Sequence, residues 1–284
     1  MRKILLPTDF SDNAWNAIVY ALEFFKNERC IFYILHTYTP AYYRLDYMMG
    51  GPSFSAIPDI GIDIALEGLD KTLADINTQY PNKKHEFKTV SAFNILTDEI
   101  QELTEKENID LIVMGTQGAT GAKEIFLGTH TVHVIRKSKK PVLVIPNEYK
   151  YKAVNSILFP SDYTNTIKLS ELALLIDIIK LQEAKLQILN VKDTYDLTPE
   201  QKTNKEIIDS HFKNIDHSFT ELKGKLMPEA IHDYINDNPI GLLAMMNHKH
   251  TFLERLIVKS NVDSIVYHTT IPFLVMPFKI FDKN

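Results

Sequence analysis

The chain has a single cysteine, Cys30, so no disulfide can form within it. It also lacks any apolar stretch close to the roughly 20 residues of a membrane-spanning helix, and its first residues, 1–7, lack the apolar segment of a signal peptide. There is no basic excess either, because 31 lysines and arginines face 36 acids and give a net charge of −5. We therefore predict a cytoplasmic protein that binds neither membrane nor nucleic acid, with Cys30 as a buried structural thiol.

Several nucleotide-binding and catalytic motifs are missing as well. No Gly-x4-Gly-Lys-Ser/Thr loop occurs, and the first apolar run ends in Pro-Thr-Asp instead of Gly-x-Gly-x-x-Gly. There is no Gly-x-Ser-x-Gly elbow. A Walker loop, a dinucleotide fingerprint and a Gly-x-Ser-x-Gly nucleophile elbow are therefore excluded, and no catalytic residue is assigned.

What the chain does have is a buried strand followed by a glycine-punctuated loop. The apolar run 111–114 is typical of a strand covered on both faces, and Gly115, Gly118 and Gly128-Thr129 follow it. Glycines permit positive φ and let an anion approach the backbone. A helix that begins near Thr129 would offer unpaired N–H groups and the positive end of its dipole. A tight strand-to-helix connection also uses glycine, but three glycines and a hydroxyl residue favour a phosphate-binding loop.

The first half alternates strands with helices. Five apolar runs are separated by four segments of helical periodicity, which predicts a doubly wound parallel sheet of α/β class. Ser11 or Asp12 is the expected cap of the first helix, and Asn94 that of a later one. Residues 38–57, rich in tyrosine, have no periodicity and are either a functional flap or an insertion. The predicted strands are 3–8, 30–37, 85–90, 111–114 and 141–146.

The second half repeats the first. Residues 157–164 repeat 4–11 with a shift of 153, and residues 272–277 repeat 141–146 with a shift of 131. The second copy is therefore shorter, mostly because the tyrosine-rich segment has no counterpart. Such a repeat predicts two domains, at residues 1–147 and 154–284, which pack on each other across their fifth strands.

These features also carry a family resemblance. Gly, two residues, Gly, nine residues and Gly-Thr resemble the nucleotide-binding signature of the universal stress protein family, and residues 4–11 and 141–146 are similar to its first and last strands. The repeat is similar to the tandem members, in which one chain supplies both halves of what is elsewhere a dimer. The resemblance implies two Rossmann-like domains of the adenine nucleotide alpha hydrolase-like type, each with strand order 3-2-1-4-5.

The resemblance further implies a stress-response protein that binds ATP, ADP or AMP in its first copy, with Mg²⁺ held through the phosphates. Ligands of open parallel sheets bind where the strand order reverses, here between strands one and four. Asp9 would contact the ribose or a hydrated Mg²⁺, although a turn or helix-cap role suits it equally. Carried over residue by residue, the site comprises Pro7, Thr8 and Asp9, Thr37 beside the adenine, Met114 as an apolar wall, Gly115, Gly118, Gly128 and Thr129 at the phosphates, and His130 as a further N–H donor.

The second copy departs from this pattern. At a shift of 131, Met246, Lys249 and Lys259 replace the three glycines, and Ser260 replaces Thr129. Side chains there would strain a left-handed backbone and obstruct the phosphates. We therefore predict a structural second copy without nucleotide, and a Gly115→Val variant that stays folded while losing binding.

Three functions are compatible with these residues. A regulatory nucleotide-binding module fits best. An ATP-hydrolysing enzyme needs a group that orients the attacking water, and no convincing base is present. We therefore expect at most slow hydrolysis of ATP. A protein that works only through protein contacts is disfavoured by the intact glycine spacing. The histidine pairs 130/133 and 248/250 lack further ligands, so no metal site is predicted. The preferred nucleotide, the protein partner and a further homodimer are left open.

Overall fold

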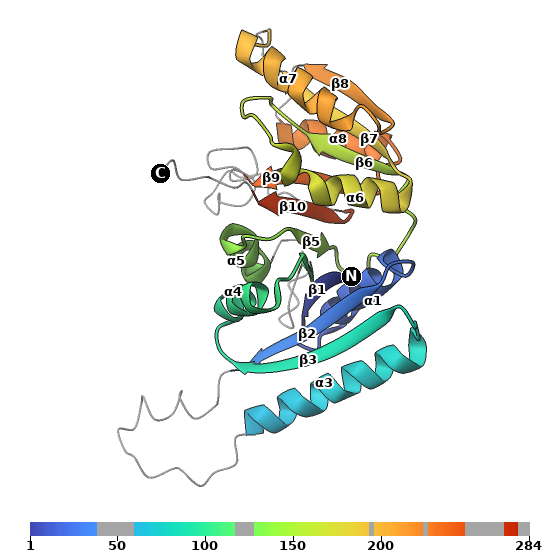
Figure 1. Cartoon of the computed structure of the whole chain (residues 1–284), viewed down its shortest axis with the longest axis vertical. Helices are drawn as coiled ribbons and strands as arrows, with labels where there is room; N and C mark the ends of the chain where they lie inside the picture. Colours follow the sequence, from blue (N-terminus) through green and yellow to red (C-terminus); the bar gives the residue numbers. More distant parts are fainter. Residues whose placement is uncertain (39–59, 117–127, 193–195, 224–226, 248–269, 278–284) are drawn as a thin grey trace, which may run out of the picture.

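A computed structural model describes residues 1–38, 60–116, 128–192, 196–223, 227–247 and 270–277 (Figure 1). The first copy consists of β1 (Arg2–Pro7), α1 (Asp12–Phe24), β2 (Cys30–Tyr38), α3 (Ile60–Gln79), β3 (His85–Phe93), α4 (Leu96–Glu107), β4 (Leu111–Gly115), α5 (Thr129–Lys137) and β5 (Val142–Ile145). The second consists of β6 (Ser156–Pro160), the 3-10 turn η1 (Leu169–Glu171), α6 (Ala173–Gln182), β7 (Lys185–Lys192), α7 (Pro199–Phe212), β8 (His217–Lys223), α8 (Met227–Asp237), β9 (Leu242–Asn247) and β10 (Phe273–Pro277).

All of these strands form one ten-stranded sheet in the order β3-β2-β1-β4-β5-β10-β9-β6-β7-β8. Each half is parallel and has the order 3-2-1-4-5, which confirms the predicted fold. The halves join where β5 and β10 pair antiparallel, with Val144 opposite Phe273 and Val142 opposite Val275. The fifth strands therefore make the expected contact (Figure 1).

The repeat holds at the level of strand register. Ile4 pairs with Leu111 in the first copy, and Ile157 pairs with Leu242 in the second. These partners are related by the shifts of 153 and 131 read from the sequence. The same holds at the end of the fourth strands, where Gly115 is opposite Ile145 and Met246 is opposite Met276. Met246 therefore takes the strand position of Gly115.

A shared core connects the two copies. Buried side chains of α1, such as Ile18 and Phe24, belong to the same hydrophobic cluster as Phe159 of the second copy. Tyr20 of α1 packs against the rings of Tyr149 and Tyr151 in the connection, at centroid distances of 6.1 and 5.5 Å. Because burial removes apolar surface from water, this cluster stabilises the two copies as one unit.

Two local predictions are confirmed and two need correction. Ser11 caps α1 by accepting a hydrogen bond from Ala14 N at 3.2 Å, and Cys30 is fully buried, which raises the pKa of its thiol to about 12. The expected cap Asn94 is wrong, because Ile95 precedes α4 and Asn94 instead donates to Glu99 at 3.0 Å. The third strand also runs past residue 90 to Phe93, since its partner β2 continues that far.

Candidate functional site

The turn after β1 is held by one backbone hydrogen bond to β2 and by hydrogen bonds that its own side chains accept. Thr8 N–H donates to Leu35 O at 2.8 Å, and Thr8 Oγ1 accepts from Phe10 N at 3.0 Å. Asp9, which is exposed, accepts from Ser11 N at 3.1 Å, so the turn role that the sequence allowed for this carboxylate is present. The backbone is left-handed at Phe10, with φ of 63°. The turn thus holds Asp9 at the carboxyl end of the sheet.

The end of β4 lies next to the start of α5. Thr131 Oγ1, which is buried, donates to Gly115 O at 2.9 Å, and Gly128 N–H donates to Thr116 O. Thr129 and His130 are exposed in the first turn of α5. The strand end and the helix start are therefore fixed against each other. Gly118 lies outside the described residues.

The structure corrects the reason for the glycine at the end of β4. Gly115 does not have a left-handed backbone, so the expected strain from positive φ does not apply there. Instead, a Cβ at Gly115 would lie 2.5 Å from Asn13 Oδ1 and 2.8 Å from Asn13 Cγ. The first turn of α1 approaches β4 too closely for a side chain. A Gly115→Val substitution would therefore collide with α1, and it would not report on phosphate binding alone.

A packing motif that the sequence did not reveal lies on the β2 side. His36 Nδ1 is hydrogen-bonded to Thr8 O at 2.8 Å, and the His36 ring stacks on Phe10 at 4.3 Å between centroids. The Phe10 ring fills the space beside Gly68 of α3, where a Cβ would lie 2.5 Å from the ring. The half-buried Thr37 follows His36 in β2. Gly68 inside a helical segment was the available signal, because glycine lowers helix stability and its presence there suggests a packing reason.

The predicted site residues are thus partly brought together. Since β1 pairs with β4, the carboxyl ends of the two strands lie at the same edge of the sheet. This edge holds Pro7–Asp9, the half-exposed start of α5 at Gly128, and the buried Met114, which is 6% exposed. Thr37 lies one strand further along, on β2. The arrangement matches the place where a doubly wound sheet binds ligands.

The second copy keeps the turn, but the contacts that follow the turn differ in the described residues. Ser161 Oγ accepts from Tyr163 N at 3.2 Å and Tyr163 has φ of 58°, as in the first copy. Thr166, the counterpart of Asn13, instead donates to Asn204 of α7 at 2.7 Å, and α6 begins only at residue 173. Met246 is 7% exposed and lies in the hydrophobic core. Lys249, Lys259 and Ser260 lie outside the described residues.

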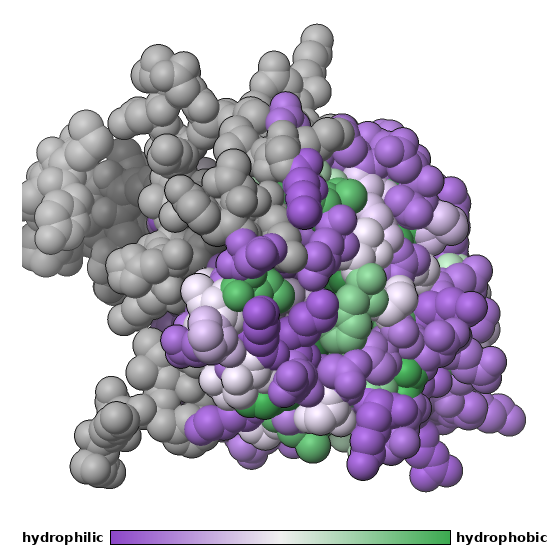
Figure 2. Space-filling model, turned by 90° about the horizontal axis from the view of Figure 1, so that it is seen from above, coloured by the Kyte–Doolittle hydropathy of each residue, from purple (hydrophilic) through white to green (hydrophobic). Residues whose placement is uncertain are grey.

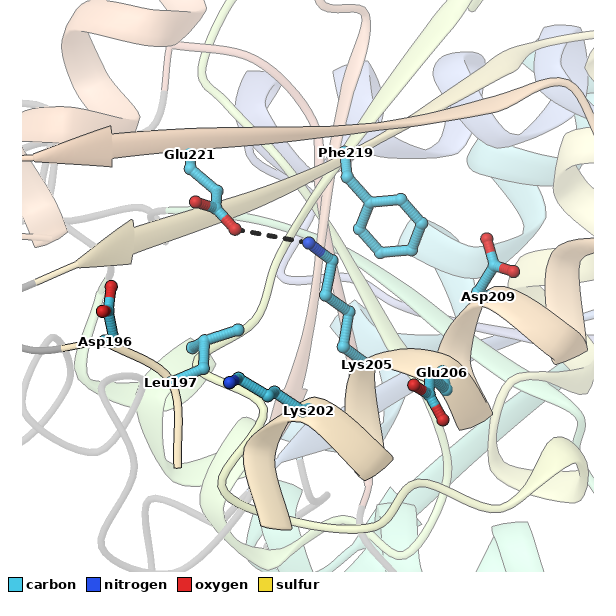
Figure 3. A pocket seen from close by; sticks show the side chains of 8 residues that line it. All are labelled: Asp196, Leu197, Lys202, Lys205, Glu206, Asp209, Phe219 and Glu221. Carbon is cyan, nitrogen blue, oxygen red and sulfur yellow. Dashed lines mark hydrogen bonds and ion pairs between the residues drawn. The ribbon is translucent and has the colours of Figure 1, made fainter. Parts of the chain in front are cut away.

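A separate hollow of about 640 Å³ lies in the second copy, between α7 and the edge strand β8 (Figure 3). Lys205 Nζ forms an ion pair with Glu221 at 3.3 Å and lies 5.1 Å from the centre of the Phe219 ring. Since its central charges neutralise each other, this hollow gives no preference for an anion. The surface at this end of the molecule is largely hydrophilic, with apolar residues scattered over it (Figure 2).

Comparison with known proteins assigns the family. The model of the universal stress protein family matches residues 1–146. The chain belongs to the universal stress protein family. Universal stress protein MJ0577 of Methanocaldococcus jannaschii is 33% identical over 159 residues, which cover 51% of this chain and 94% of that protein. Universal stress protein MJ0531 of the same organism is 30% identical over 152 residues, which cover 52% and 84%.

A solved structure extends the likeness to both copies of this universal stress protein. The crystal structure of a universal stress protein from Archaeoglobus fulgidus covers 96% of this chain, with 97% of its own length aligned, a TM-score of 0.69 and 20% identity. At this identity the likeness supports the fold alone. Among the residues described here, none of the helices is long and apolar enough to span a bilayer.

Proposed function

We propose that this universal stress protein is a regulatory module that binds ATP or a related adenine nucleotide in its first copy only. The observation that carries the proposal is the contact between the end of β4 and the start of α5. Thr131 Oγ1 donates to Gly115 O at 2.9 Å, in the copy that has the glycine spacing. This contact puts a helix start at the edge where β1 and β4 end.

The start of α5 is suited to a phosphate group. Val132 N–H makes the bond to Gly128 O at 3.0 Å, so the N–H groups of residues 129–131 have no partner within the helix. α5 has no acidic residue in its first turn, which it shares with α6, whereas the other described α-helices each have one or more. A carboxylate there would repel an anion, whereas the helix dipole attracts one.

The remaining residues of the first copy complete the proposed site. Thr37 would meet the adenine through its backbone, Met114 would offer an apolar contact, and Asp9 would face the ribose. Within the described part of the chain there is no group of acidic, histidine and cysteine side chains that could hold a metal by itself. We propose that Mg²⁺ is bound through the phosphates, because Mg²⁺ commonly keeps waters and takes few protein ligands.

The second copy is proposed to stabilise the first. Met246 takes the strand position of Gly115 and is buried in the core, and α6 starts only at residue 173. The counterpart of the start of α5 lies outside the described residues. We place the domain boundary between residues 147 and 154, within a connection whose tyrosines pack on α1. A cytoplasmic location and a protein partner that reads the nucleotide state complete the proposal.

The test is nucleotide titration by calorimetry, after unfolding and refolding have removed any bound nucleotide. We expect one ATP per chain, and ATP that stays uncleaved over hours. A Thr129→Glu variant should bind about tenfold or more weakly, because like charges about 4 Å apart repel by about 1 kcal/mol in water and about 4 kcal/mol near a protein surface. Thr129→Gln is the control of equal size without charge.

Three results would contradict the proposal. Binding of two nucleotides per chain would show that the second copy is competent. Equal affinity in the Glu and Gln variants would place the phosphates away from α5. Rapid conversion of ATP to ADP or AMP would indicate an enzyme instead of a binding module.

A further inference from the structure

A hydrogen bond crosses from the second copy to the helix proposed to bind phosphate. Asn247, the last residue of β9, donates from Nδ2 to Ile135 O of α5 at 3.0 Å. Asn247 is half-buried and is paired with Pro277 of β10. At the shift of 131, Asn247 is the counterpart of Thr116 in the first copy. Thr116 follows β4 directly, where the proposed phosphate loop begins.

The acceptor, Ile135 O, is one of the backbone carbonyl groups at the carboxyl end of α5 that have no hydrogen-bond partner within the helix. The last four carbonyls of an α-helix have no partner within it, and in α5 these include Val134 and Ile135. Ser138 N–H satisfies Val134 O at 2.8 Å, and Gln101 Nε2 donates to Lys137 O at 3.2 Å. Asn247 therefore supplies the bond to Ile135 O from outside the first copy.

Apolar contacts hold the same end of α5. Val134 and Ile135 are 2% and 1% exposed, and they belong to one hydrophobic cluster with Met245 and Phe273 of the second copy. Figure 1 shows α5 beside β5, at the junction with β10. The carboxyl end of α5 is thus packed on the second copy, while its amino end faces the carboxyl edge of the first.

We propose that Asn247 is a positioning residue, through which the second copy holds α5 in the orientation that binds the nucleotide phosphates. This inference rests on the function proposed above. A helix of nine residues is about 13 Å long and moves as a rigid element. A shift at Ile135 therefore displaces the N–H groups at Thr129 and His130. The coupling is reciprocal, so a bound phosphate also strengthens the contact at Asn247.

The experiment compares ATP and adenosine binding in matched variants. Asn247→Ala removes the donor, and Asn247→Asp keeps the shape but places an acceptor against Ile135 O. Asn238→Ala is the control, because Asn238 Nδ2 donates to Tyr234 O at 2.9 Å at the end of another helix, α8. We expect about five- to tenfold weaker ATP binding in both Asn247 variants, unchanged adenosine binding, and wild-type affinities in the control.

The outcomes separate this inference from the function on which it rests. If the wild-type chain binds ATP and both Asn247 variants bind it equally well, the inference is overturned while the proposed function stands. Equal losses for ATP and adenosine would also overturn it, because they would indicate general disruption of the first copy. A wild-type chain that binds no nucleotide would overturn the proposed function and this inference with it.

Discussion

Gly115 could be required for packing against α1 or for binding a ligand, and a Gly115→Ala substitution, which adds one methyl group, tests the packing role. In a Gly115→Ala variant the new Cβ would lie 2.5 Å from Asn13 Oδ1 and 3.1 Å from Asn13 Nδ2. The optimal separation of such atoms is about 3.5 Å or more, so the contact is strongly repulsive. Asn13 is only 6% exposed and sits in the first turn of α1. Relief therefore requires the terminal amide of Asn13 to move, and the burial of Asn13 restricts that movement.

Overpacking of this kind costs about 1–3 kcal/mol of unfolding free energy. All three of the nearest atoms belong to the Asn13 side chain, so Asn13→Ala should remove the clash. The double variant should then recover about 1–2 kcal/mol relative to the sum of the single variants. Trp15, the single tryptophan, lies two residues further along α1, so its fluorescence follows unfolding of this region in urea.

Gly241→Ala is the matched control in the second copy. Its Cβ would meet Val154 Cα at 3.2 Å, a milder contact, and we expect a smaller loss of stability. The reasoning would be refuted if Gly115→Ala were as stable as the wild type. It would also be refuted if the effects of Gly115→Ala and Asn13→Ala were additive, because additive effects mean that the two side chains do not clash.

Two further predictions concern titratable groups. Burial lowers the pKa of His217, but hydrogen bonds to Ile215 O and to Asp209 at 3.0 Å outweigh it and raise the pKa. The wild type should therefore be more stable than a His217→Gln variant by the full amount below the unfolded pKa of about 6.5, and this difference should be lost as pH rises through the folded pKa. Urea unfolding midpoints of both proteins at several pH values measure the difference. A difference in midpoint that widens with pH would contradict the prediction. Burial raises the pKa of Cys30 to about 12, so a thiol reagent at pH 8 should modify Cys30 only when urea unfolds the chain. Rapid labelling of the native chain would contradict this prediction, because it would show that the thiol is accessible.

The repeat made most of the fold predictable. Strands buried on both faces are continuous apolar runs, and the two copies of Pro-Thr/Ser-Asp mark the same turn in each half. The strand order came from the family resemblance, because periodicity does not determine which strands are neighbours. The shift of 131 equated Met246 with Gly115, and the two residues take the same strand position in the structure. Local patterns repeated along the chain therefore predicted the elements and the two copies, and the resemblance supplied the order of the strands.

The site was less predictable, because its decisive contacts join distant residues. Glycine next to a loop suggested backbone freedom at Gly115, whereas its neighbour is Asn13, about a hundred positions earlier in the chain. Asn247 resembles any asparagine at a strand end until α5 of the other copy is placed beside it. The prediction that Asn94 caps α4 was also wrong, because Ile95 occupies the cap position. Contacts between distant elements decided the first two cases, and a local hydrogen bond of Asn94 to Glu99 accompanies the third.

The difference between the copies involves both sides of one contact. Where the fourth strand ends in Gly115, α1 can start directly after the turn and lay Asn13 against the strand. Where it ends in Met246, that side chain is buried in the core, and the chain runs through residues 165–172 before α6 begins. Thr166 bonds to α7 instead of approaching β9. The second copy therefore differs from the first both at the end of the fourth strand and at the start of the first helix, and a buried methionine takes the place of the glycine.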